Sequence, residues 1–259
     1  MAKKFFSMAM LAMLATSFVA CDKGDDDNSD GNGNVNININ VVDLGLPSGI
    51  KWATCNVGAT NPWNYGNYYA WGETETESDY SWDNYKYCNG SGKKLNKYCS
   101  DANFGYDSFT DDLTTLESSD DVATAVFGAD YSMPTTADWD ELCNQCYWVW
   151  TTNYNEHNVS GYIVYRAKSD GDKGGKVYNG GTAPASYSLS DAHIFLPAAG
   201  CLNGSNLSGA GQYGRYWSSS LYGNNPVNAC NCYFYSNGVY SSTDNYRCCG
   251  FSVRPVKRP

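Results

Sequence analysis

From Val159 to its C-terminal end the chain repeats one pattern, in which short apolar runs alternate with turns of Gly, Asn and Ser. The most apolar runs are 162–165, 194–196 and 251–253. Runs of this length between turn residues predict short β-strands. Residues 35–41 alternate apolar and polar side chains, which predicts one more strand with a single buried face. The chain is therefore expected to fold around β-structure.

Two stretches instead carry helix signals. The acidic run 119–121 is predicted to begin a first helix, which Gly128 ends. Thr135 is predicted to cap a second helix, with Asp138 as its capping-box partner and Trp139 on the inward face. Two helices packed against a twisted antiparallel sheet, joined by long loops, define an α+β domain, which we expect to span residues 35–259.

The N-terminal residues predict export. Two lysines at positions 3 and 4 precede an apolar run over 5–19, which is too short to span a bilayer comfortably. Residues 1–20 are thus predicted to be a signal peptide. The run ends at Phe18-Val19-Ala20-Cys21, which resembles a bacterial lipoprotein cleavage box with Cys21 as the lipidated residue. Cleavage near Ala20 without lipid, giving a soluble secreted protein, is the alternative.

After Cys21, residues 21–34 hold no apolar side chain other than the cysteine and predict a flexible acidic tether. Its acidic cluster resembles the signal that sends Bacteroidetes lipoproteins to the outer face of the outer membrane. The chain has a net charge of −10, which argues against nucleic acid and against charge-driven docking on anionic lipid. Any membrane contact is expected through the N-terminal lipid alone.

No metal or cofactor is expected. The run 26–31 resembles the start of a calcium loop, but Ile37 stands where the bidentate Glu is required. The pair at 143 and 146 has the spacing of a zinc or redox site, yet no second such pair follows. His157 and His193 are the two histidines, and neither lies near a recognisable nucleophile motif. Disulfide connectivity among the ten cysteines after Cys21 stays open.

Seven short runs, in order, resemble the Fibrobacter major paralogous domain family, which is common among Bacteroidetes surface lipoproteins. The runs are VDLGLPSG at 42–49, KWATCNVGA at 51–59, YAWGET at 69–74, MPT at 133–135 with Trp139, FLPAAG at 195–200, YWSSS at 216–220 and SVRPV at 252–256. In that family a basic residue usually precedes the Met-Pro-Thr run, where this chain has Ser132. The resemblance covers residues 41–256.

The resemblance implies a C-type-lectin-like fold whose first and last strands pair and whose C-terminal strands carry a variable face. It also implies that the gene is a candidate target of a diversity-generating retroelement, which rewrites AAC-type codons at adenines. Such rewriting never yields Trp, Met, Lys, Gln or Glu. Residues 218–256 contain none of these five types, whereas the other 220 residues contain 33. Composition alone would place about six in that window, so we expect a hypervariable region at 221–251.

The same window is rich in Ser, Asn, Tyr and Gly, the residues that antibody paratopes favour. Positions 221, 229, 234, 239, 247 and 250 are interpreted as scaffold, and Cys232 as core. The predicted ligand-contacting residues are Tyr222, Asn224, Asn225, Asn228, Asn231, Tyr233, Tyr235, Asn237, Tyr240, Ser241, Ser242, Thr243, Asp244, Asn245, Tyr246, Cys248, Cys249 and Phe251.

These features favour a surface-displayed protein that binds a protein or glycan ligand, with an unassigned oligomeric state. A structural or adhesive subunit of a surface appendage is the alternative. An enzyme is not expected, although formylglycine-generating enzymes share the lectin-like fold, because their Arg-Gly-Gly-Ser-Trp-type run is absent. The Glu-Pro-Asn and Trp-Asn-Asp runs of calcium-dependent lectins are absent too, so recognition is expected to need no metal.

Overall fold

The computed structural model describes residues 39–223 and 225–259. The predicted signal peptide, Cys21, the acidic tether, residues 35–38 and Asn224 lie outside the described residues. The α-helices are α1 (Val122–Phe127) and α2 (Thr136–Gln145), and short 3-10 turns occur at Tyr106–Ser108, Ser118–Asp120, Tyr154–Glu156 and Asp170–Asp172. The strands are β1 (Val41–Val42), β2 (Lys51–Ala53), β3 (Tyr131–Ser132), β4 (Cys146–Thr151), β5 (Gly161–Arg166), β6 (Lys176–Val177), β7 (His193–Pro197), β8 (Cys201–Asn203), β9 (Asn206–Ser208), β10 (Tyr213–Leu221), β11 (Asn228–Tyr235), β12 (Gly238–Tyr246) and β13 (Val256–Lys257).

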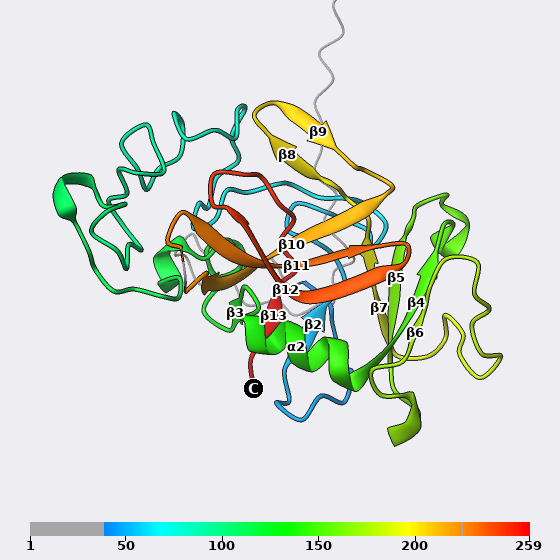
Figure 1. The fold of residues 1–259 in the computed structure, drawn as a ribbon. Coiled ribbons are helices and arrows are strands. Elements are labelled where there is room, and N and C mark those ends of the chain that lie inside the picture. Colours follow the sequence, from blue (N-terminus) through cyan, green and yellow to red (C-terminus); the bar gives the residue numbers. More distant parts are fainter. Residues whose placement is uncertain (1–38, 224) are drawn as a thin grey trace, which may run out of the picture. The chain divides into compact units, whose positions relative to one another are not determined.

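The strands form several small sheets rather than one. Their orders are β1-β2-β13-β3, β6-β4-β5-β7, β10-β11-β12 and β8-β9 (Figure 1). All pairings are antiparallel except β4 with β6. The class is therefore α+β, as predicted, but the single sheet is wrong. The C-terminal strand β13 pairs with β2, the second strand along the chain, and not with β1.

Helix α2 joins the sheets through one apolar core. Its Trp139 and Leu142 are fully buried and pack in the same cluster as Trp148 of β4 and Phe234 of β11. The helix contacts all three strands of the β10-β11-β12 sheet and lies against one face of it (Figure 1). Helix α2 thereby covers one face of the C-terminal sheet. The other face of the sheet is not covered by this helix.

Both helices begin where the sequence predicts, and α1 also ends at the predicted residue. Asp121 caps α1 by accepting from the backbone of Ala123 and Thr124, and Gly128 ends the helix with a φ of 90°. Such a φ is strained for any residue with a Cβ atom, so glycine is the fitting residue there. Thr135 and Asp138 form the expected capping box of α2. Polar side chains next to each helix therefore determine where both helices begin.

Asp138 supports α2 in a pH-dependent way. Burial raises the pKa of its carboxyl, but hydrogen bonds from Arg258 and Thr135 outweigh burial and hold that pKa below its usual value. A depressed pKa adds stability that is full above the unfolded-state pKa of about 4 and is lost as the pH falls through the folded-state pKa. We expect Asp138→Asn to lower the free energy of unfolding by about 1 kcal/mol at pH 7.

At pH 3 the difference between wild type and Asp138→Asn should shrink, as measured by urea unfolding at both pH values. Asp140→Asn, on the same helix and outside the capping box, is the control and should show a smaller loss at pH 7. An equal deficit for Asp138→Asn at pH 7 and pH 3 would contradict the assignment of that stability to the charged carboxylate.

Two of the expected strands are found in the structure and one is not. The runs at 162–165 and 194–196 are confirmed as β5 and β7, which pair with each other. The run at 251–253 is not a strand: Phe251 and Ser252 form single bridges, to Tyr69 and Tyr216. This segment crosses between sheets, so its neighbours change from one residue to the next and no ladder can form.

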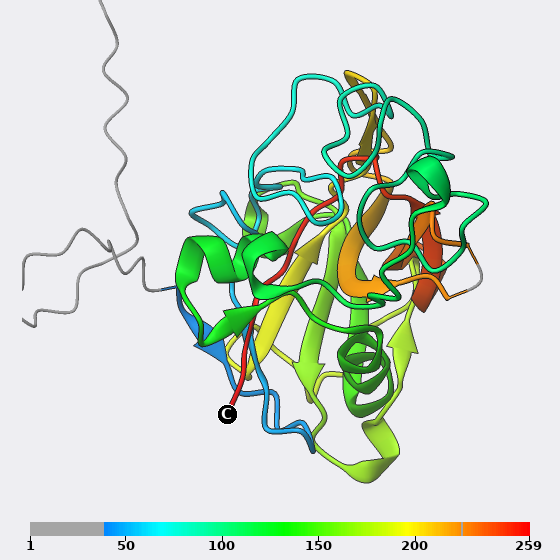
Figure 2. The ribbon, with the colours of Figure 1, turned by 90° about the vertical axis from the view of Figure 1, so that its left-hand side faces the viewer.

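A long segment, residues 54–130, contains no strand (Figure 2). Scattered backbone hydrogen bonds, such as the one from Tyr69 to Phe251, attach it to the rest of the chain, and side chains add to them. Arg247, fully buried at the end of β12, donates to the backbone oxygens of Lys97, Tyr98 and Pro226 and to the hydroxyl of Tyr85. The guanidinium thereby fixes these loops beside the C-terminal sheet. The interpretation of position 247 as scaffold is confirmed by this burial.

A second buried arginine, Arg254, ties the N-terminal region to β7. Its guanidinium donates to the backbone oxygens of Ala53, Thr54 and Phe195 and to the side-chain oxygen of Asn56. No ion pair among the described residues includes Arg254. Its charge is therefore solvated by backbone dipoles, which replace the water that burial removes.

Within the described residues, no helix is long and apolar enough to cross a membrane. No disulfide joins any two cysteines of that part of the chain.

Candidate functional site

The two faces of the β10-β11-β12 sheet differ sharply. Tyr216, Cys232 and Phe234 point into the core with α2 and are fully buried, so the prediction that Cys232 is a core residue is confirmed. The opposite face carries Tyr213, Arg215, Tyr233, Tyr235 and Tyr240, which are half-buried or exposed. We call these five residues the tyrosine face. Strand alternation produces the split, because successive side chains point to opposite sides.

The strand register brings the five side chains together. Tyr213 pairs with Tyr235, Arg215 with Tyr233, and Tyr233 in turn with Tyr240. The ring centroids of Tyr233 and Tyr240 lie 6.0 Å apart with 17° between the ring planes. Those of Tyr235 and Tyr240 lie 6.2 Å apart at 22°. Cross-strand aromatic pairs of this kind stabilise the sheet while leaving part of each ring in solvent.

Arg215 lies on the edge strand β10 of the tyrosine face, beside the central Tyr233. Its guanidinium carbon is 4.4 Å from the ring centroid of Tyr233, within the range of a cation–π interaction. The Nη1 atom donates to the side-chain oxygen of Asn231 at 3.3 Å. The ring and the amide hold the guanidinium in one place, which is a precondition for directional binding.

The phenols of this face can donate hydrogen bonds at neutral pH. Burial raises the pKa of Tyr213 above its ordinary value. A hydrogen bond with Tyr240 raises the pKa of Tyr235, and the two hydroxyl oxygens are 3.4 Å apart. Both phenols therefore stay protonated. The bond between Tyr235 and Tyr240 uses one hydroxyl donor, so the other hydroxyl of that pair keeps its donor for a ligand, whereas the Tyr213 hydroxyl already meets the Cys201 thiol at 3.4 Å.

The predicted contact residues fall into three groups by exposure. Four are exposed: Asn237, Tyr240, Ser242 and Tyr246. Nine are half-buried: Tyr222, Asn225, Asn228, Tyr233, Tyr235, Ser241, Thr243, Asp244 and Asn245. Four are buried: Asn231, Cys248, Cys249 and Phe251. Asn224 lies outside the described residues.

The four buried residues correct the predicted contact set. The side-chain oxygen of Asn231 accepts from Arg215 and Thr243, and its amide nitrogen donates to the Thr243 backbone. Because Asn231 is also fully buried, this network leaves its side chain out of reach of a ligand. Cys248, Cys249 and Phe251 belong to the main apolar cluster, and Phe251 stacks on Trp217 with centroids 4.1 Å apart. All four support the fold.

The remaining contact residues do not form one cluster. Tyr240 and Tyr246 are the exposed tyrosines of β12, at opposite ends of the strand. Six residues of strand separate them by about 20 Å. Tyr246 meets the edge of Trp82, from the long loop segment, with centroids 5.9 Å apart. The tyrosine face is therefore a site distinct from the surface around Tyr246.

Sequence reasoning missed Tyr213 and Arg215. Both lie on β10, before the window 221–251 in which contact residues were sought. That window was drawn from the residue types absent after Trp217, so it could not include an earlier strand. Alternation between Tyr213 and Gly214, and between Arg215 and Tyr216, is the signal that would have placed both side chains on one face.

Neither cysteine nor histidine chemistry is supported by the geometry. Burial raises the pKa of Cys146 to about 12, so the thiol is protonated and unreactive. His157 stacks on Trp63, and the His193 ring meets the Tyr154 hydroxyl and the Asp191 backbone oxygen. No group of three or more metal-binding side chains occurs among the residues the structure describes.

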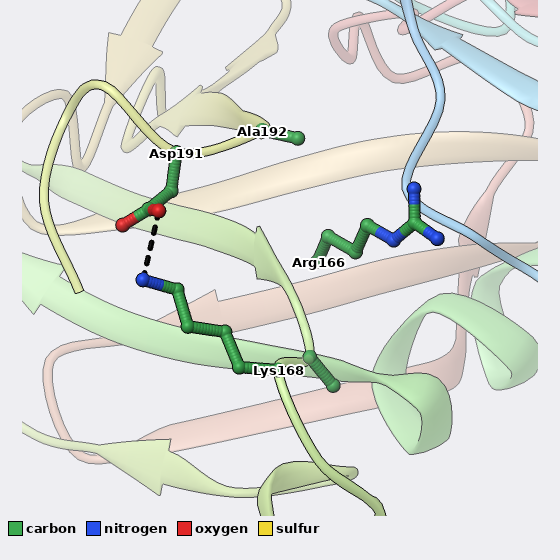
Figure 3. Close-up of a pocket in the computed structure, with 5 residues that line it drawn as sticks. Arg166, Lys168, Asp191 and Ala192 are labelled. Carbon is green, nitrogen blue, oxygen red and sulfur yellow. Dashed lines mark ion pairs between the residues drawn. The ribbon is translucent and has the colours of Figure 1, made fainter. Parts of the chain in front are cut away.

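A cavity of about 320 Å³ lies elsewhere, lined by Arg166, Ala167, Lys168, Asp191 and Ala192. Figure 3 shows that its charged groups do not converge: Lys168 and Asp191 pair with each other at 2.8 Å, and Arg166 points away from them. The Arg166 side chain packs over Gly45, where a Cβ atom would come within 2.7 Å of its Nε. Because ligand sites gather polar groups around one point, this hollow is a weaker candidate than the tyrosine face.

A family profile described as a domain of unknown function (DUF8237) matches residues 150–256. The matched range contains β5, β7 and the whole β10-β11-β12 sheet. No curated protein and no solved structure matches the chain.

Proposed function

We propose that this protein is a surface-displayed binding protein that recognises a protein or glycan ligand through the tyrosine face. The observation that carries the proposal is the asymmetry of the C-terminal sheet, which buries Tyr216, Cys232 and Phe234 on one face and presents tyrosines on the other. Tyrosine gives a large amphipathic contact area at low entropic cost, which suits recognition. The half-buried guanidinium of Arg215 adds a charged donor to that area.

The proposal includes display on the outer membrane through a lipid on Cys21, supported by the N-terminal apolar run and the acidic residues after Cys21. It also includes a C-type-lectin-like fold of the Fibrobacter major paralogous domain type. Pairing of the C-terminal strand β13 with the early strand β2, and the C-terminal hairpin of β11 and β12, agree with such a fold.

Diversification by a retroelement is a further part of the proposal. Its support is the absence of five residue types from 218–256, together with the exposure of Tyr240 and Ser242. The codons of the gene test it. Variable positions whose codons do not end in C, with no near-identical template repeat and reverse transcriptase nearby, would count against diversification while leaving ligand binding as a separate question.

Ligand binding is tested with the exported protein on an array of glycans and purified extracellular proteins. We expect Tyr240→Ala to remove at least about nine-tenths of the bound signal, because truncating a central aromatic contact costs about 2 kcal/mol or more. Tyr246→Ala is a matched control, since the two side chains are 47% and 53% exposed on one strand. We expect that control to keep most of the signal.

Addition of a chelator should leave the signal unchanged, because recognition through phenols and a guanidinium needs no metal. Loss of binding in Tyr246→Ala with retention in Tyr240→Ala would move the site to the Trp82 end of the sheet. No array signal from the wild type would refute the proposed binding function for the ligand classes on the array.

A further inference from the structure

Arg215 has unused binding capacity on an open surface. A guanidinium carries five N–H donors, and in the described structure the Arg215 side chain uses one of them, from Nη1 to Asn231. None of the ion pairs among the described residues involves Arg215. The remaining donors are available to a ligand, in a chain whose own net charge is −10.

Three of the other four arginines already use their donors, and the fourth, Arg166, lies outside the tyrosine face. Arg247 and Arg254 are fully buried and direct their donors at backbone oxygens. Arg258 pairs with Asp138 at 2.8 Å, and Arg166 packs over Gly45. Arg215 differs because its guanidinium is both held in place by Tyr233 and left without a carboxylate partner among the described residues.

We propose that Arg215 and the four tyrosines of this face form a subsite for an acidic saccharide unit, a pyranose ring that bears a carboxylate. This inference rests on the proposed function and names the ligand class of the same site. A planar guanidinium binds a carboxylate with two parallel hydrogen bonds. The C–H face of a pyranose packs on aromatic rings, and the phenol hydroxyls of Tyr235 and Tyr240 can bind its hydroxyl groups.

The size of the tyrosine face favours one or two sugar units over a protein partner. A stable protein interface buries about 800 Å² on each side and includes a pocket for an anchor side chain. Here Tyr240 is 47% exposed and the other four side chains are half-buried. Five side chains suit one or two sugar units but fall short of the roughly 20–30 residues that each partner contributes to a stable protein interface. The carboxylates of an acidic peptide would bind the guanidinium, but the peptide would leave the tyrosine rings without a packing partner.

The experiment compares two matched ligands on the full exported chain by isothermal titration calorimetry. One is a hexasaccharide of alternating glucuronic acid and N-acetylglucosamine, and the other is the same hexasaccharide with every carboxylate reduced to an alcohol. We expect the acidic form to bind at least about tenfold tighter, since hydrogen bonds between charged groups are the stronger ones. A hexaglutamate peptide is the third ligand and should bind more weakly than the acidic saccharide.

Variants separate the parts of the site. Arg215→Gln should bind both saccharides with similar affinity, and Arg215→Lys, which keeps the charge without the planar fork, should retain only part of the preference. Tyr233→Phe should keep the preference for the acidic form, because the ring under the guanidinium remains. Arg166→Gln, an arginine outside the tyrosine face, should behave as wild type. Unfolding curves for each variant confirm that the fold is intact, and Arg215→Lys keeps the test decisive if Arg215→Gln misfolds.

Equal affinity of the wild type for the acidic and reduced saccharides would overturn the inference while leaving glycan recognition by the tyrosine face standing. Tighter binding of hexaglutamate than of the acidic saccharide would overturn it in favour of an acidic peptide. Binding to neither saccharide would also overturn it. The array comparison of Tyr240→Ala with Tyr246→Ala decides the proposed function separately, because it does not depend on a carboxylate.

Discussion

Replacing Arg254 with methionine should lower the free energy of unfolding by roughly 3–5 kcal/mol. The substitution keeps much of the side-chain volume but removes all donors from the backbone oxygens of Ala53, Thr54 and Phe195 and from the Asn56 side chain. Each of these buried acceptors would lose its partner at a cost of about 1–3 kcal/mol before relaxation. Chemical denaturation of the two proteins measures the difference.

Arg258→Met is the control for that measurement. Arg258 is 40% exposed in its side chain and pairs with Asp138 near the surface, so its removal should cost about 1 kcal/mol or less. Equal losses in the two variants would contradict the view that Arg254 stabilises the protein through buried acceptors. A loss well below 3 kcal/mol for Arg254→Met would mean that water enters and satisfies those oxygens.

Phe251→Ala should be about as damaging to the fold, with an expected loss of roughly 3–4 kcal/mol. The ring is fully buried and stacks on Trp217 with centroids 4.1 Å apart, so its removal leaves a cavity in the main core. By contrast, Tyr240→Ala should change stability by less than about 1 kcal/mol, because its ring is half in solvent.

Measuring stability and ligand binding together distinguishes the two roles within the predicted contact set. Tyr240→Ala should lose binding and keep its stability. Phe251→Ala should lose stability, and it should affect binding only through the Arg215 guanidinium, which lies 5.5 Å from the Phe251 ring centroid. A stable Phe251→Ala variant with lost binding would restore Phe251 to the contact surface and remove it from the core.

Local sequence signals predicted the local structure well. The caps at Asp121, Thr135 and Asp138 act on neighbouring backbone groups, so the residues that fix each helix start are close in sequence. Strands β5 and β7 could be predicted equally well. An apolar run that is buried on both faces can be recognised in the sequence without knowing which strand it pairs with. The division into several sheets and the parallel strand β6 could not be predicted, since both depend on pairing between segments that are distant in the sequence.

The site shows the same limit. Alternation correctly placed Cys232 and Phe234 on the buried face and Tyr233 on the other. It failed at Asn231, which shares the face of Tyr233 but is covered by Arg215 from the neighbouring strand. Cross-strand register decides that contact, and no spacing within one strand encodes it. The same register brings Arg215 and Tyr213 into the tyrosine face.

The two buried guanidinium groups have a consequence for how this chain can change over evolution. Arg247 and Arg254 direct most of their hydrogen bonds at backbone oxygens, including those of Lys97, Tyr98, Ala53 and Phe195. Every amino acid carries that oxygen, so these bonds place no demand on the side chain of the partner residue. A partner whose side chain is not buried, such as Lys97, can therefore be substituted without losing its attachment, and purifying selection should fall on the two arginines themselves.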